Sequence, residues 1–160
     1  MSAPAPPLDL HALAAALVAE HGGPRGAALE LLRRIQQAEH WVSDDRLAEA
    51  ARLLGMTAEE LDSIATFYSH LFRRPVGRRL ILLCDGASCW LSGGEAVRRA
   101  LMARLGLDAG EMAADGDVTW LPSACIGGCD SAPAALVGRD RRLVGPLAPD
   151  RLDPLFEGPA

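Results

Sequence analysis

The chain has 160 residues, of which 49% are hydrophobic and 23% are charged, and its formal net charge is −5. This length and apolar content are enough to bury a core and exclude a wholly disordered chain. The acidic balance argues against nucleic-acid binding, which usually needs a basic patch. No apolar run reaches the length of a membrane span, and residues 1–7 lack the basic and apolar regions of a signal peptide. We therefore expect a cytoplasmic protein without direct membrane insertion.

The first half of the chain predicts a helical bundle. Apolar residues recur at helical spacing in four segments, 8–21, 26–39, 44–54 and 57–68. Ser43 is an N-cap signal for the third helix, and Thr57 begins a capping box for the fourth. Gly55 suits the left-handed position that follows a helix. We expect a disordered tail at 1–7 and a helical bundle over residues 8–72.

The second half predicts a mixed α/β domain. Composition and periodicity change near residue 73, and the apolar run from Leu80 to Cys84 is typical of a strand buried on both faces. Ser92, with a glutamate three residues later, is interpreted as a capping box. Further strands are expected at 118–121, 134–137 and 143–144, and helices at 93–105 and 149–155. The fold class is therefore α+β, with a mixed sheet in a second domain over residues 73–160.

The chain has four cysteines, Cys84, Cys89, Cys125 and Cys129, and all lie in this second half. Their spacing is C-x4-C, then 35 residues, then C-x3-C. Each pair follows a predicted strand and shares its loop with glycine, which lets the backbone approach inorganic sulfide and offer N–H groups to it. Two strand ends at one edge of a sheet would bring the four thiolates together. The pattern predicts one iron–sulfur cluster.

Other uses of the cysteines are less consistent with the spacing. A structural zinc site usually contains a C-x2-C knuckle, and a thioredoxin-type dithiol requires one, but neither pair has this form. Four inert cysteines are not expected to fall into two loop pairs. A Rieske centre needs two histidine ligands, and all four histidines lie in the helical half. Spacing alone leaves open a [4Fe–4S] cluster, and zinc stays open as the staple of a non-redox binding module.

The residues around the cysteines resemble a known family, the thioredoxin-like [2Fe–2S] ferredoxin subunit of NADH:quinone oxidoreductase, the respiratory complex I. The resemblance covers about residues 10–157. It rests most on the four-cysteine spacing together with the Phe67-Tyr68 motif. The matching stretches include Ala65–His70, Pro75–Arg78, Cys84–Cys89 and Cys125–Pro133.

This resemblance implies a thioredoxin-like second domain without a redox disulfide, in which Cys84, Cys89, Cys125 and Cys129 bind one [2Fe–2S] cluster. It also implies that the helical bundle packs on a flavin-binding, NADH-oxidising partner subunit, whose FMN exchanges an electron with the cluster. NADH and flavin are expected on that partner, and no catalytic residue is expected on this chain. The assembly, with its other subunits, would lie on the cytoplasmic side of a membrane-bound complex.

The same module serves NAD-dependent formate dehydrogenases and NAD-linked hydrogenases. The stretch Cys84–Gly94 is more similar to the complex I form, whereas Ala132–Val137 is more similar to those relatives. The roles of Asp85, Trp90 and Asp130, which flank the predicted ligands, stay open. We interpret Phe67 and Tyr68 as packing residues.

Overall fold

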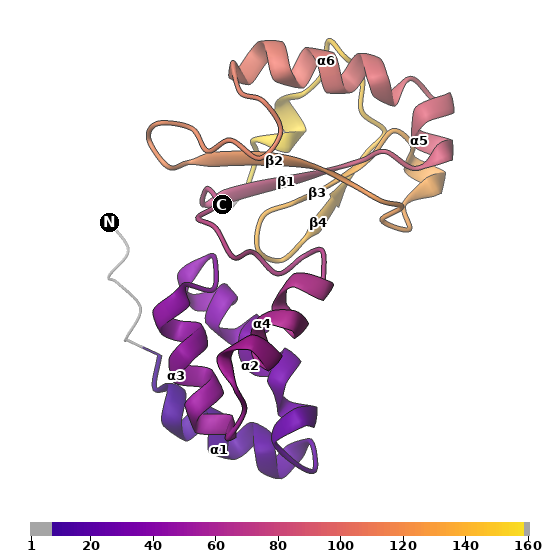
Figure 1. The fold of residues 1–160 in the computed structure, drawn as a ribbon. Helices are drawn as coiled ribbons and strands as arrows, with labels where there is room; N and C mark the ends of the chain where they lie inside the picture. Colours follow the sequence, from indigo (N-terminus) through magenta and orange to yellow (C-terminus); the bar gives the residue numbers. More distant parts are fainter. Residues whose placement is uncertain (1–7, 159–160) are drawn as a thin grey trace. The chain divides into compact units, whose positions relative to one another are not determined.

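The computed structural model describes residues 8–158, so the predicted tail at 1–7 lies outside the described residues. Contacts divide the chain into two compact units, one ending at Pro75 and the other beginning at Val76. The first is helical and the second contains a sheet, as Figure 1 shows. This arrangement confirms the predicted α+β class, with a helical first half and a mixed α/β second half.

The first unit contains the four expected helices. They are α1 (Leu10–Glu20), α2 (Pro24–Glu39), α3 (Asp44–Leu54) and α4 (Ala58–Phe67). The predicted caps are confirmed, because the Ser43 hydroxyl accepts the Arg46 N–H, and Thr57 and Glu60 form a complete capping box. Gly55 adopts the left-handed conformation, with φ of 62°. Each helix contributes buried apolar side chains to one common core.

The segment after α4 is tied back to this bundle. The Gln36 side chain donates to the His70 carbonyl at 2.8 Å and accepts the Phe72 N–H at 2.7 Å. The Phe67 side chain, by contrast, is 80% exposed and meets the Tyr68 ring edge-on at a centroid distance of 5.3 Å. Phe67 therefore does not pack into the core of this unit, because the helix turns it away, and its predicted packing against the second half of the chain stays a prediction.

The second unit is built on a four-stranded sheet. Its strands are β1 (Arg79–Cys84), β2 (Val118–Ser123), β3 (Ala135–Val137) and β4 (Arg142–Val144). Their spatial order is β2-β1-β3-β4, with β1 and β2 parallel and the other pairs antiparallel. The sheet is therefore mixed, as expected. Short 3-10 turns lie between β2 and β3, at η1 (Cys129–Ser131), and after β4, at η2 (Asp153–Leu155).

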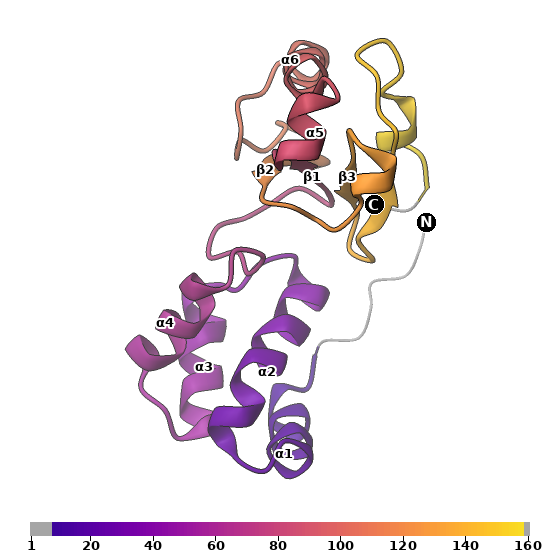
Figure 2. The same cartoon turned by 90° about the vertical axis from the view of Figure 1, so that its right-hand side faces the viewer.

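One helix covers a face of this sheet. Alternate residues of β1, such as Ile81, share a core cluster with Val97 and Leu101 of α6 (Gly94–Leu105) and with Trp120 of β2. Figure 1 shows α6 lying along that face, and Figure 2 shows the same packing from the side.

Two local expectations in this unit are wrong. A short helix, α5 (Ala87–Leu91), precedes α6, and the Ser92 N–H bonds to the Ser88 carbonyl at 3.0 Å. Ser92 therefore ends α5 instead of capping the next helix, and Gly93, with φ of 92°, makes the turn between them. The final helix expected at 149–155 is only the 3-10 turn η2, because Pro154 lacks the N–H that a longer helix would need at that position.

Candidate metal centre

Two loops leave the sheet at the same edge. Cys84, the last residue of β1, is in register with Ser123, the last residue of β2. Because the two strands are parallel, their carboxyl ends meet at one edge. The Asp85 N–H donates to the Ser123 carbonyl at 2.9 Å, so the loops begin side by side. This edge carries all four cysteines.

The first cysteine pair is buried. Cys84 ends the strand, Cys89 lies in the helix, and the two thiols are within hydrogen-bonding reach of each other. The pKa of the Cys89 thiol is raised, first by burial and also by the neighbouring Cys84 thiol, while the Ala134 N–H opposes the shift. The N–H of Ala134 thus points at a sulfur atom, as a donor to a cluster thiolate would.

The second pair is exposed. The Sγ atoms of Cys125 and Cys129 lie 3.7 Å apart, at the two ends of a tight loop that enters η1. Gly127 has a φ of 83°, a conformation that glycine adopts without strain. Its N–H lowers the pKa of the Cys125 thiol, and the Cys129 thiol lowers it further. The loop therefore favours the thiolate form, which is the form that binds iron.

Gly86 lies where the two loops meet. A side-chain carbon added there would lie 3.4 Å from the Cys84 sulfur and 3.4 Å from the Cβ of Cys125. Cys129 is also near enough to Cys89 to influence its charge. The structure thus brings the four sequence-predicted cysteines together. The two pairs lie on either side of Gly86, which has no side chain to separate them.

These residues fit an iron–sulfur cluster. All four cysteines are free thiols. Within residues 8–158, there is no group of three or more histidine, cysteine or acidic side chains that could hold a single metal ion. A [2Fe–2S] cluster does not need such a group, because each iron takes two thiolates and the remaining ligands are sulfides. Two facing thiol pairs with nearby N–H donors meet that requirement.

The other residues that the sequence analysis named near the cysteines are exposed. Asp85, in the loop after β1, and Asp130, in η1, carry exposed carboxylates. Trp90 is 65% exposed, so it is not a core residue, and its neighbour Leu91 is 76% exposed. The sequence analysis did not name Leu91 as a candidate surface residue, although its position beside Trp90 forms an apolar pair that could have been noticed.

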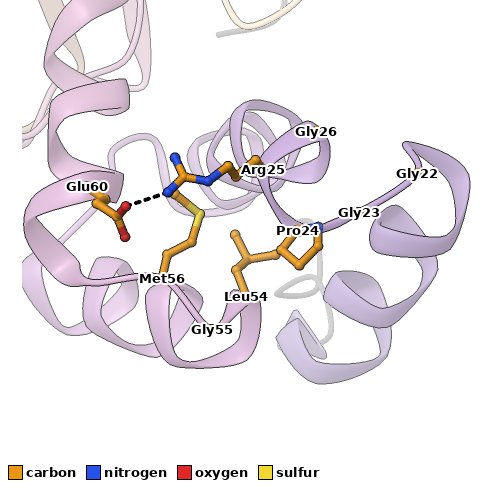
Figure 3. Close-up of a pocket in the computed structure, with 9 residues that line it drawn as sticks. All are labelled: Gly22, Gly23, Pro24, Arg25, Gly26, Leu54, Gly55, Met56 and Glu60. Atoms are coloured by element: carbon orange, nitrogen blue, oxygen red, sulfur yellow. Dashed lines mark hydrogen bonds and ion pairs between the residues drawn. The ribbon is translucent and has the colours of Figure 1, made fainter.

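A hollow of about 410 Å³ lies in the helical unit, and it is a separate feature. It lies between the start of α2 and the turn from α3 to α4, as Figure 3 shows. The Arg25 guanidinium bonds to the Glu60 carboxylate there at 2.7 Å. Its lining includes glycines, Met56 and this ion pair but no cysteine, so it takes no part in the metal centre.

Comparisons with known proteins show which family and which relatives this chain is similar to. Residues 14–158 match the family described as thioredoxin-like [2Fe-2S] ferredoxin. One relative, an NADH-quinone oxidoreductase subunit of Pseudomonas aeruginosa, is 39% identical over 134 residues, which are 84% of this chain and 80% of that protein. The corresponding protein of Escherichia coli K12 is 36% identical over the same shares.

A solved structure is similar as well. It is an NAD+-reducing [NiFe]-hydrogenase in the H2-reduced state, with 30% identity and a TM-score of 0.67. The match covers 81% of this chain but only 22% of the hydrogenase chain.

Among residues 8–158, no helix is long and apolar enough to cross a bilayer.

Proposed function

Because the chain belongs to the thioredoxin-like [2Fe–2S] ferredoxin family, we propose that it is the electron-transfer subunit of an NADH:quinone oxidoreductase. In this proposal Cys84, Cys89, Cys125 and Cys129 hold one [2Fe–2S] cluster. The observation that carries the proposal is the meeting of two thiol pairs at the edge where the parallel strands β1 and β2 end. The quinone oxidoreductase relatives in two bacteria support the choice of assembly.

The bound cluster supplies a one-electron redox couple, and the reduced flavin of a partner subunit is the electron donor that we propose. The work of this chain's own residues is to hold and insulate the ligands. Burial of Cys84 and Cys89 keeps water from one side of the site, while the N–H groups of Ala134 and Gly127 face sulfur atoms. Such donors stabilise thiolates and help to set the reduction potential.

The exposed side of the site is where we propose that the partner docks. Cys125 and Cys129 lie at the surface, and Trp90 and Leu91 of α5 project into solvent directly after Cys89. Large apolar side chains grouped at a surface mark contact sites, and tryptophan is enriched among the residues that dominate binding energy. A flavin subunit bound there would lie next to the cysteines. We further propose that this assembly is peripheral, on the cytoplasmic side of a membrane-bound complex.

The structural comparison supports a second candidate assembly, an NAD-linked hydrogenase. The similar hydrogenase chain contains this fold as about a fifth of its length. The chain would then pass electrons within an NAD-linked hydrogenase, with the same four ligands. The higher identity to the quinone oxidoreductase relative, 39% against 30%, leads us to prefer the quinone oxidoreductase.

The experiment that tests the proposal uses the full chain with its native partners. The tagged chain is purified from its own organism, and the co-purifying chains are identified by mass. We expect a flavin-binding subunit and the other subunits of a quinone oxidoreductase, and we expect NADH to reduce this chain's cluster only when the flavin subunit is bound. Recovery of nickel–iron hydrogenase subunits would shift the assignment to the second assembly. Equal reduction by NADH without the flavin subunit would overturn the proposed electron donor.

A further inference from the structure

Leu143 lies directly over the loop that carries the exposed cysteines. A side-chain carbon built on Gly128, the residue before Cys129, would lie 2.7 Å from Cδ1 and 3.1 Å from Cδ2 of Leu143. The third-nearest heavy atom, at 3.5 Å, is the Cγ of the same leucine. The methyl groups of Leu143 therefore occupy the space that a side chain at position 128 would need.

A side chain at position 128 would meet the leucine first, without needing a left-handed backbone. Gly128 has a φ of −94°, which any L-residue adopts, whereas its neighbour Gly127 is in the left-handed region. An alanine at position 128 would thus not be forced into a left-handed backbone conformation. It would meet the methyl groups of Leu143, which must then move away from the loop.

Leu143 is not a core residue of the sheet. Neighbouring side chains alternate between the two faces of a strand, and Val144 belongs to the core cluster while Leu143 does not. Leu143 is 45% exposed. On the same face its cross-strand partner is Leu136, and Leu136 in turn pairs with Leu82. The contact with Gly128 is therefore separate from the packing that holds the fold together.

The segment after Leu143 also touches the loop that follows Cys129. Gly145 lies against the carbonyl of Ser131, and the Leu147 N–H donates to the Pro133 carbonyl at 2.8 Å. The Cys84 N–H donates to the Ala134 carbonyl at 3.0 Å, which links this loop to β1. The exit of the loop is thus held by backbone contacts, whereas Gly128, within the loop and next to Cys129, is covered by the Leu143 side chain.

We infer that Leu143 is a positioning residue for the metal centre: it covers Gly128, fixes the loop between Cys125 and Cys129, and keeps water from the loop backbone at Gly128, which is buried. This inference rests on the proposed function, because it concerns the same four ligands. Reduction adds negative charge to an already anionic centre, and water stabilises the more highly charged form. Loss of the leucine therefore shifts the reduction potential to a more positive value and speeds cluster loss.

The test is a double-mutant cycle on the full-length holoprotein, with Leu143→Ala, Gly128→Ala and the two combined. Leu136→Ala is the matched control, since it truncates the neighbouring leucine on the same face. Potentials are measured by redox titration followed by the paramagnetic signal, and cluster loss by the fading of visible absorbance in excess chelator. We expect each single variant to lose its cluster about tenfold faster than the wild type, with a positive shift in potential.

The combined variant distinguishes a paired contact from two separate effects. We expect the alanine methyl at position 128 to fill part of the space left by Leu143→Ala, so the loss rate and potential return toward wild-type values. Values for Leu143→Ala equal to those of Leu136→Ala, or effects of the two single changes that simply add, would overturn the inference. A wild-type chain that binds zinc and no iron would instead refute the proposed function, and with it this inference.

Discussion

Cys84 and Ser123 are register partners at the ends of two parallel strands. This pairing sets the position of the proposed metal centre, because the ends of the two strands lead into the segments that carry the other cysteines. The Asp85 N–H bonded to the Ser123 carbonyl keeps the two loops together from their first residues. A one-residue shift between β1 and β2 would move the first cysteine away from the second pair.

Replacing Cys125 by serine tests whether the exposed pair is needed for the cluster. Cys125 is at the surface and belongs to neither core cluster, so we expect Cys125→Ser to fold with the secondary structure of the wild type. We expect it to lose most of its iron, since a hydroxyl replaces a soft thiolate. Iron analysis and circular dichroism measure the two effects. Ser88→Ala, an exposed polar change in α5, is the control, and iron retained in Cys125→Ser at the control level would contradict the ligand assignment.

Trp90 and Leu91 are predicted to bind the flavin subunit. The double variant Trp90→Ala/Leu91→Ala should weaken that association by about 2 kcal/mol or more, the usual effect of removing a buried interface tryptophan. The iron content should not change, because both side chains point into solvent. Isothermal titration of the purified subunits measures the affinity.

Met112→Ala provides a control for the interface prediction. Met112 is also a large exposed apolar residue, but it bridges to Thr119 near the beginning of β2, away from the cysteine edge. We expect unchanged affinity for this variant. Equal affinities for the wild type and for the Trp90/Leu91 variant would place the partner on another surface.

Thr57 is predicted to stabilise the helical unit through its side chain. Its hydroxyl accepts the Glu60 N–H at 3.1 Å, and Thr57→Ala should cost about 1 kcal/mol of unfolding free energy. Thr66→Ala in the same helix is the matched control, because the Thr66 hydroxyl donates only to carbonyls of its own helix, those of Asp62 and Ser63. Such back-bonding does not stabilise a helix. Urea unfolding followed by helical circular dichroism compares the two, and equal losses would argue against the capping role.

Glu60 is predicted to make the stability of the bundle depend on pH. Its pKa is lowered from the ordinary value of 4.5, first by the Thr57 N–H and then by Arg25. A carboxyl whose pKa is lowered on folding stabilises the protein above its ordinary pKa, and this contribution is lost as the pH falls through the lowered value. The melting temperatures of the wild type and Glu60→Gln should therefore differ at neutral pH and converge in acid. A difference that stays constant with pH would exclude this origin.

Much of this arrangement could be predicted from the sequence. The helices have clear apolar spacing and cap residues such as Ser43 and Thr57, and the run ending at Cys84 is typical of a buried strand. The cysteine spacing indicated two loops at one sheet edge. Each of these features depends on residues that are close together in the sequence, so it can be recognised without the structure.

The remainder depends on contacts between distant segments. The five residues of α5 are too few for a periodic pattern, so Ser92 looked like the start of a helix when it ends one. The contact of Leu143 with Gly128 had no sequence signal, because an exposed leucine on an edge strand resembles any other. The burial of one cysteine pair and the exposure of the other likewise follow only from the packing of the folded chain.

The most direct test of the central claim is the metal and sulfide content of the full-length chain purified without oxygen. We predict about two iron atoms and two acid-labile sulfides per chain, with a paramagnetic signal that develops on one-electron reduction. One tightly bound zinc per chain and no iron would contradict the account, because the four cysteines would then serve as a structural staple.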